Sequence, residues 1–432
     1  MSIAASTVCK QRPQGLRTAR TIRYESIVGG AVYLFLFCGS ISLIEPSPYD
    51  FMSLVAIPLW FFGGFRLHRS LIFVLGVWTL YNVVGFISLA PYWHEDNTPL
   101  YQFQTLYLYV TVVFFTIYFS ERSTDRMELA LRGYTAGCIF ASLVGLVGYV
   151  DIAGIGQYTT MYEGRVSGTF KDPNVLGSYL VLSAVYIAQS VMLGTARRVW
   201  LSVLGLLVIL AAVLLAFSRG SWGATIVALG MMTTMSFLTT TGRIRRRIVI
   251  VVTVCLVLCA IMIIVILADE RTRELLTLRF SATQDYDVGE TGRFGNQLRS
   301  LTALLDLPEG YGPLRFRLTY GLEPHNSYIG AFANYGWAGG FLWLLVCGAT
   351  IWVGFRLMWI ASPMRRYAHI FVPTTFVLLM QGLQIDVDHW RQLYLCFGAV
   401  WGMEAARIKL NSRNAASGGS SPLAPKTEAT AI

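Results

Sequence analysis

The stretch VWLSVLGLLVILAAVLLAFSRGSWGATIVALGMMTTMSFLT, residues 199–239, decides the fold class. Arg219 is its only charged residue and lies at its midpoint. A helix needs about 20 apolar residues to cross the hydrocarbon core of a bilayer. The stretch has 41 residues, so the chain must reverse near Ser218–Ser221 and form two membrane-spanning helices.

Composition extends this pattern to the whole chain. Of the 432 residues, 55% are hydrophobic and only 13% are charged, and the mean hydropathy is +0.55. The apolar runs are long and do not alternate at period two, so helices are favoured over a membrane barrel. We predict an all-α integral membrane protein with about twelve transmembrane helices, at residues 27–44, 49–64, 70–91, 99–119, 128–150, 174–193, 199–217, 221–239, 248–268, 335–357, 367–384 and 389–407.

The distribution of charge orients these helices. With the N-terminus inside, the inside segments hold 23 of the 34 Lys and Arg residues but only 6 of the 24 acidic residues. Basic residues accumulate on the cytoplasmic side of membrane proteins. We therefore predict a multi-pass inner-membrane protein with both termini cytoplasmic. Because this rule accounts for the net charge of +10, no nucleic-acid partner is expected.

The predicted spans divide the chain into three parts. Residues 1–26 form a basic cytoplasmic tail, residues 27–407 form the membrane domain, and residues 408–432 form a cytoplasmic tail predicted to be disordered. Two outside segments, about 151–173 and 269–334, are too long to be turns. The second is a large external loop between the ninth and tenth spans, so the working surface is predicted to be external.

Three polar motifs fall on this external side. The first, GRVSGTFKDPN (164–174), leads into the sixth span, and the second, FSRGSWG (217–223), joins the seventh and eighth. The third is spread over the long loop and includes TGR (291–293) and PHNSY (324–328). The other histidines, including His94 and His389 in short outside turns, are assigned no role.

Together these motifs resemble the O-antigen ligase and O-antigen polymerase superfamily, which are integral-membrane glycosyltransferases of bacterial surface polysaccharide assembly. The resemblance covers the twelve spans, the internal N-terminus, the external loop and the order of the motifs. It implies a GT-C-like fold with Arg219, Arg293 and His325 as catalytic residues. It also implies an undecaprenyl-diphosphate-linked glycan as donor, with no metal, cofactor or nucleotide at the site.

The residue types fit the same chemistry. Outside the inner membrane a sugar must arrive already activated, and a lipid diphosphate provides that activation. Its departure needs fixed cations, and arginine stays charged and binds phosphate oxygens bidentately. The acceptor hydroxyl must lose a proton, and histidine titrates near neutral pH. Glu323, two residues before His325, is a rival base.

Each candidate also has a structural interpretation. Arg219 is alternatively a snorkelling interfacial side chain, and Arg293 alternatively forms a surface salt bridge. His325 lies in a helix-start sequence and is alternatively structural. We predict that the substrate-binding residues are Arg165, Lys171, Asn174, Asn326 and Glu323, although the segment that contains Arg165, Lys171 and Asn174 is alternatively a basic loop that caps the sixth span.

The sequence thus predicts a metal-independent, inverting membrane glycosyltransferase. It would move a glycan from an undecaprenyl-diphosphate carrier to an acceptor sugar hydroxyl, such as one on lipid A–core, at the periplasmic face. Ligase and polymerase activities for lipopolysaccharide or exopolysaccharide both fit, and the ligase is favoured. A transporter of lipid-linked glycans fits less well, because the spans are nearly free of charge in their interiors. The sugars, the acceptor and the oligomeric state are left open.

Overall fold

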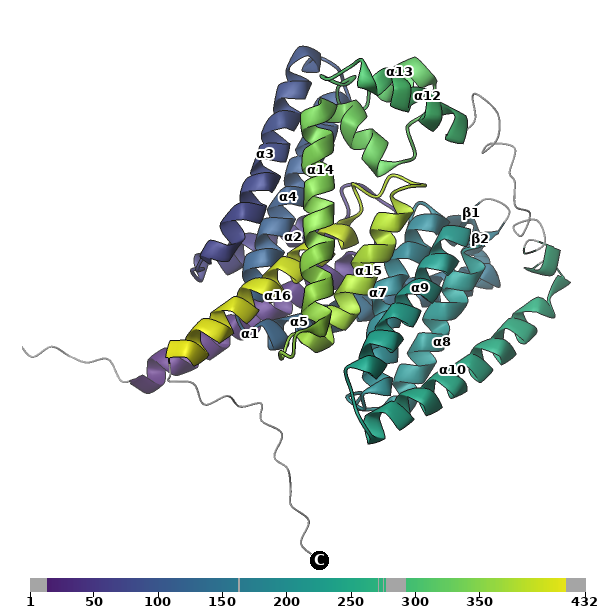
Figure 1. Cartoon of the computed structure of the whole chain (residues 1–432). Helices are drawn as coiled ribbons and strands as arrows, with labels where there is room; N and C mark the ends of the chain where they lie inside the picture. Colours follow the sequence, from purple (N-terminus) through teal and green to yellow (C-terminus); the bar gives the residue numbers. More distant parts are fainter. Residues whose placement is uncertain (1–13, 162–163, 271, 275, 277–292, 417–432) are drawn as a thin grey trace, which may run out of the picture.

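The computed structural model describes residues 14–161, 164–270, 272–274, 276 and 293–416, and for residues 14–23 and Arg293 it describes the backbone alone. Within these residues the fold is all-α apart from one hairpin, in which β1 (Thr160–Met161) pairs antiparallel with β2 (Arg165–Val166). The helices, labelled in Figure 1, are α1 (Gln14–Cys38), α2 (Pro48–Phe62), α3 (Ile72–Leu89), α4 (Thr98–Ser120), α5 (Ser123–Tyr149), α6 (Gly156–Thr159), α7 (Pro173–Met192), α8 (Val199–Leu215), α9 (Arg219–Leu238), α10 (Arg243–Leu267), α12 (Arg293–Leu305), α13 (Phe316–Tyr320), α14 (Ser327–Trp359), α15 (Arg365–Gln381) and α16 (Arg391–Ala416).

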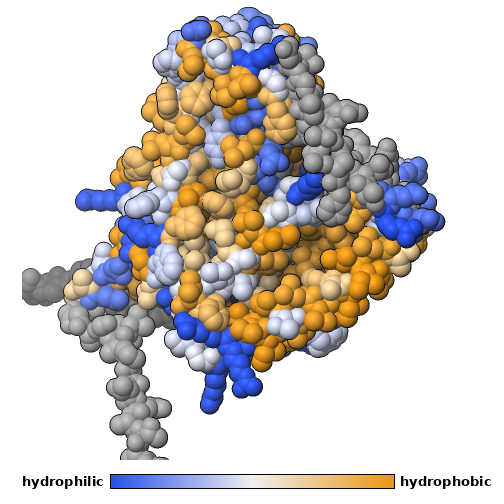
Figure 2. Space-filling model, turned by 45° about the vertical axis from the view of Figure 1, so that its right-hand side comes forward, coloured by the Kyte–Doolittle hydropathy of each residue, from blue (hydrophilic) through white to orange (hydrophobic). Residues whose placement is uncertain are grey.

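Seven helices of the described chain are long and apolar enough to cross a membrane: α3 with its flanking turns, α4, α5, α7, α9, α10 and α14. The apolar part of α1, together with α2 and α8, is shorter. Figure 2 shows a broad hydrophobic surface with hydrophilic patches above and below it. The chain is therefore a multi-pass membrane protein.

Each of the twelve predicted spans overlaps a helix, but the last two overlap α15 and α16, which are not among the helices long and apolar enough to cross, and several boundaries differ. Helix α1 begins at Gln14, within the predicted tail, and α16 continues to Ala416, so residues 408–416 are helical. The reversal predicted near Arg219 is confirmed, because α8 ends at Leu215 and α9 begins at Arg219. Phe217, in the left-handed conformation with φ 47°, makes the turn.

Glycine pairs allow the helices to pack closely. Gly133 and Gly137 of α5 lie against the backbone of α1, where an added Cβ would be 2.6 Å from the carbonyl oxygens of Tyr33 and Phe37. A Cβ added to Gly402 of α16 would likewise lie 2.6 Å from the Cβ of Phe119 in α4. Small residues spaced four apart let membrane helices approach without side chains between them. These contacts join α1 to α5 and α4 to α16.

Helix α14 is broken near its N-terminus. Gly336 has φ 64° and ψ −166°, a conformation essentially restricted to glycine, so the segment 327–335 runs in a different direction from the rest. The loop before α14 satisfies the backbone at the break: Trp337 N donates to Pro308 O (2.8 Å) and Tyr311 N to Ala333 O (2.7 Å). In Figure 1, α12 and α13 lie together beside this end of α14.

Candidate functional site

The first two motifs meet at the N-terminal ends of α7 and α9. Arg165 is buried, and its guanidinium donates from Nε to Ala216 O (3.0 Å) and from Nη2 to Asn174 Oδ1 (3.0 Å). Asn174 is the second residue of α7, and its carbonyl oxygen accepts from Ser221 Oγ (3.2 Å). Arg165 and Asn174, both predicted to bind substrate, thus hold the turn before Arg219.

Arg219 is exposed at the first position of α9. Ser218 caps this helix, since its side chain accepts from Ser221 N (3.3 Å). Ser221 Oγ lies 3.1 Å from Ser178 Oγ, which in turn accepts from Gln381 Nε2 (2.9 Å) at the C-terminal end of α15. Arg219 is therefore fixed, through its own helix end, to the end of α15.

The third motif contacts the same end of α15. Asn326 caps α14 by accepting from Tyr328 N (3.0 Å) and Ile329 N (3.1 Å), and its Nδ2 donates to Leu383 O (3.2 Å). Ser327 N donates to Gly382 O (2.8 Å). Asn326, predicted to bind substrate, is buried and makes these contacts within the protein.

His325 lies at the surface of this turn in the left-handed conformation, with φ 48°. Its side chain is 42% exposed, and Nδ1 lies 3.4 Å from Oδ2 of Asp386. Gln297 of α12 supports the turn by donating to the carbonyl oxygens of Pro324 (3.0 Å) and His325 (3.2 Å). A carboxylate on Nδ1 orients the ring and leaves Nε2 for a substrate.

Glu323 is the more buried acid beside His325. Its Oε1 lies 3.6 Å from Arg317 Nε and makes no hydrogen bond with the part of the chain that is described. Burial raises the pKa of the Glu323 carboxyl to about 7; Asp386 and Asp388 add to the rise, whereas Arg317 and His325 oppose it. A carboxyl that titrates near neutral pH can exchange protons, so Glu323 stays a rival base.

Two predicted residues are not joined to this cluster by a described contact. Arg293 is the first residue of α12, and its side chain lies outside the described residues. Lys171 forms an exposed ion pair with Glu45 (3.2 Å). Lys171 also lines a cavity of about 250 Å³, together with Glu45, Asp172, His389 and Arg391.

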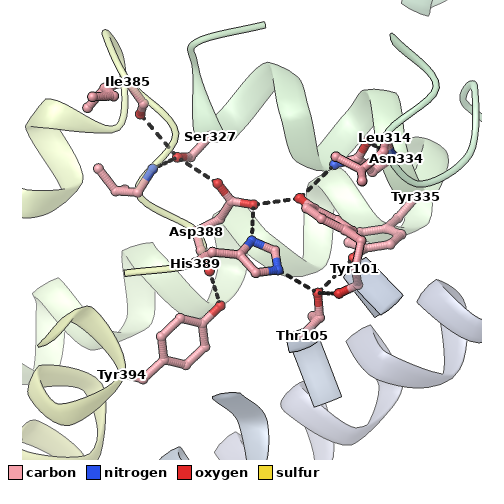
Figure 3. A network of polar contacts seen from close by, with 11 residues as sticks. Tyr101, Thr105, Leu314, Ser327, Asn334, Tyr335, Ile385, Asp388, His389 and Tyr394 are labelled. Carbon is pink, nitrogen blue, oxygen red and sulfur yellow. Dashed lines mark hydrogen bonds and ion pairs between the residues drawn. The ribbon is translucent and has the colours of Figure 1, made fainter. Parts of the chain in front are cut away.

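The loop between α15 and α16 holds a second carboxylate and histidine, shown in Figure 3. Asp388 Oδ2 accepts from Tyr101 OH (2.8 Å) and lies 3.1 Å from His389 Nδ1, while His389 Nε2 lies 3.1 Å from Thr105 Oγ1. Burial alone would raise the pKa of Asp388, but its interactions with His389 and Tyr101 outweigh burial and lower the pKa.

The sequence motifs do not point to this loop, and they give His389, Asp386 and Asp388 no role. In the structure Asp386 contacts His325, and Asp388 lies 3.4 Å from Ser327 Oγ. The sequence does contain one signal, which is the number of ionisable residues. The short turn Asp386–Arg391 carries four ionisable side chains between two largely apolar helices. An ionisable residue at membrane depth is by default a functional candidate.

The cluster contains cations, carboxylates and histidines, but its described residues include no group of three or more His, Cys, Asp or Glu that could hold a metal ion. No protein-family model matches the chain, and no curated protein matches it. Fold and site together define an all-α, multi-pass membrane protein with a polar site at one end of its helix bundle. The arrangement can bind an anion and exchange a proton next to it.

Proposed function

We propose that the protein transfers a glycan from an undecaprenyl-diphosphate carrier to an acceptor sugar hydroxyl, as an O-antigen ligase-like enzyme. Its membrane part would have about twelve spans in a GT-C-like arrangement, with the site on the periplasmic side of the bacterial inner membrane. The carrier explains why the site lies at the end of a membrane bundle, since a lipid-linked diphosphate is held at that depth.

One observation carries the proposal: Arg219 and His325, from motifs far apart in sequence, lie on two segments that both contact the C-terminal end of α15. Gln381 bonds to Ser178 beside the α9 turn, and Gly382 bonds to Ser327 beside His325. Three helices, α7, α9 and α14, begin in this region, and a helix N-terminus carries a partial positive charge. Side chains already cap these three N-termini, namely Asp172, Ser218 and Asn326. The exposed guanidinium of Arg219 is therefore the group that favours an anion such as diphosphate.

In the proposed reaction each of these side chains has a defined role. The acceptor oxygen attacks the anomeric carbon of the donor sugar, and the bond between that carbon and the diphosphate oxygen breaks. His325 Nε2 takes the hydroxyl proton, with Asp386 on Nδ1 stabilising the resulting imidazolium. Arg219 and Arg293 bind the departing diphosphate and neutralise its charge. Attack from the side opposite the diphosphate inverts the configuration.

Deletion of the gene, followed by gel analysis of surface glycans, tests the activity and separates its two forms. For a ligase, completed polymer stays on the carrier lipid and none reaches the acceptor. For a polymerase, single repeats reach lipid A–core but long chains disappear. Lipid-linked glycan that accumulates on the cytoplasmic face would contradict both and indicate a transporter.

The role of Arg219 is tested by Arg219→Lys in the same strain. A bidentate diphosphate contact requires the planar guanidinium, so lysine should keep the charge and still lose most glycan assembly. A snorkelling interfacial residue would tolerate lysine, because both side chains have long apolar stems. Arg273→Lys, a change at another exposed arginine, is the matched control, and membrane abundance is measured for both variants.

A further inference from the structure

A second cavity lies at the opposite end of the bundle from the candidate site. Its volume is about 390 Å³, and it is lined by the α2–α3 loop, the end of α4, the start of α5, the start of α15 and the C-terminal half of α16. Helix α15 begins at this cavity and ends at the candidate site, so its 17 residues separate the two by about 25 Å.

Cations dominate the charged lining. Arg66, Arg122, Lys409 and Arg413 face one acid, Glu121. Lys409 lies 3.3 Å from Glu121, and Arg122 pairs with Glu25 and Asp125. Arg66 and Arg413 are exposed and form no ion pair with any residue that the structure describes. The cavity therefore has unneutralised positive charge.

Hydrogen-bond donors complete the cavity. Helix α5 begins at Ser123. Its N-cap residue is Arg122, whose guanidinium has no acceptor atom, and the described N-cap forms no side-chain hydrogen bond to the helix. Ser123, Thr124 and Ser120 all line the cavity. An anion in the cavity would meet the uncapped amide groups of a long helix together with the guanidinium groups.

The surroundings of Arg66 indicate that the anion is attached to a lipid. Phe62, at the end of α2, is 89% exposed, and Phe65 and Leu67 are 47% and 51% exposed. These apolar side chains flank a cation at the end of an apolar helix, where a bilayer changes from acyl chains to headgroups. A soluble anion would gain nothing from them.

We propose that this cavity binds the phosphate headgroup of an anionic phospholipid, with the acyl chains against Phe62 and Phe65. Basic pockets between membrane helices on the cytoplasmic side suit such headgroups. The site does not depend on the proposed glycosyl transfer, since binding is measured directly and at the other end of the bundle.

Native mass spectrometry of the full chain released from detergent tests the proposal. The protein is titrated with phosphatidylglycerol and with phosphatidylcholine carrying the same acyl chains. We expect retention of phosphatidylglycerol only, and an affinity about 30-fold lower in the variant Arg66→Gln/Arg413→Gln. Arg243→Gln/Arg246→Gln removes the same charge from two exposed arginines outside the cavity and should leave affinity unchanged.

Three results would overturn the proposal. The first is equal retention of the two lipids, and the second is an equal loss of affinity in the Arg243/Arg246 variant, which would indicate general surface attraction. The third is displacement of the lipid by glycerol phosphate at matched concentration, which would indicate a soluble phosphate ligand. Gel filtration of both variants checks that each still folds.

Discussion

Two histidine–carboxylate pairs take their carboxylates from the loop between α15 and α16, but they lie in different surroundings. His325 and Asp386 are 3.4 Å apart, with side chains 42% and 35% exposed. His389 and Asp388 are 3.1 Å apart, with side chains 25% and 16% exposed. Asp388 and His389 also bond to Tyr101 and Thr105 of α4, whereas His325 Nε2 has no hydrogen bond to a described residue.

The difference in exposure and hydrogen bonding determines what each pair can do. A general base needs an open nitrogen and access for its substrate, and the exposed pair has both. The buried pair has its polar atoms used within the protein, and a satisfied buried network fixes one arrangement of its surroundings. We therefore assign chemistry to His325 and positioning of the loop to Asp388, and the two residues should fail in different ways.

The largest effect is expected from His325→Ala. Loss of a general base should reduce turnover by roughly 10²- to 10⁴-fold, while donor binding and thermal stability change little. Turnover and donor affinity are measured separately on purified protein in detergent. His94→Ala, a loop histidine elsewhere on the chain, is the control. Normal turnover with saturating donor would remove His325 as the base.

Asp388→Ala should show the opposite pattern. A buried polar group left without its hydrogen-bond partner costs about 1–3 kcal/mol, so the free energy of unfolding and the melting temperature should fall clearly. Asp388→Asn keeps an acceptor for Tyr101 OH and should recover part of the loss. An unchanged melting temperature in the alanine variant would mean that the network of Figure 3 does not support the fold.

The free energy of unfolding should depend on pH through Glu323. Because its pKa is about 7 in the folded protein, against about 4.5 unfolded, the folded state binds more protons between these values. Stability should therefore fall as pH rises from about 4.5 to 7, by on the order of 3 kcal/mol, and level off above.

Glu323→Gln should remove that slope in unfolding experiments between pH 5 and 8. Its turnover should stay within a few-fold of the native value if His325 is the base. A collapse of turnover in this variant, together with weakened donor binding in His325→Ala, would exchange the roles of the two residues.

The smallest effect is expected from Asp386→Asn. Exposed ion pairs contribute at most about 1 kcal/mol, so the melting temperature should barely move. Turnover should fall, but by less than in His325→Ala, because the ring stays and loses only its orienting partner. A loss of stability as large as that of Asp388→Ala would erase the distinction between the two pairs.

Sequence patterns located the helices that lie in apolar runs, because a long apolar run is itself the signal of a membrane helix. The reversal at Arg219 required no more than the length of the 199–239 stretch. The boundaries of α1 and α16 were harder, since Gln14–Arg23 and Lys409–Ala416 are polar helical ends beyond the apolar run. A hydropathy pattern does not predict polar helical ends of this kind.

The site was only partly predictable, because its assembly depends on packing between distant segments. The motifs of Arg165, Arg219 and His325 were identified by residue type and order. That Arg165 would hold the Arg219 turn through Ala216 O depends on how β2 packs against α8. That Asp386 would reach His325 depends on how α15 packs against α14. The spacing of residues in the sequence does not predict how these elements pack together.

The break at Gly336 has a consequence for biosynthesis. As one straight helix, the 33 residues of α14 would measure about 50 Å, longer than the hydrocarbon core of about 30 Å. During membrane insertion a straight helix satisfies its own backbone, whereas the broken form needs Pro308 O and Tyr311 N as partners. In the proposed orientation those partners reach α14 only after the preceding loop has crossed the membrane. In that orientation the break at Gly336 can form only once residues 308–311 lie on the same side of the membrane as the start of α14.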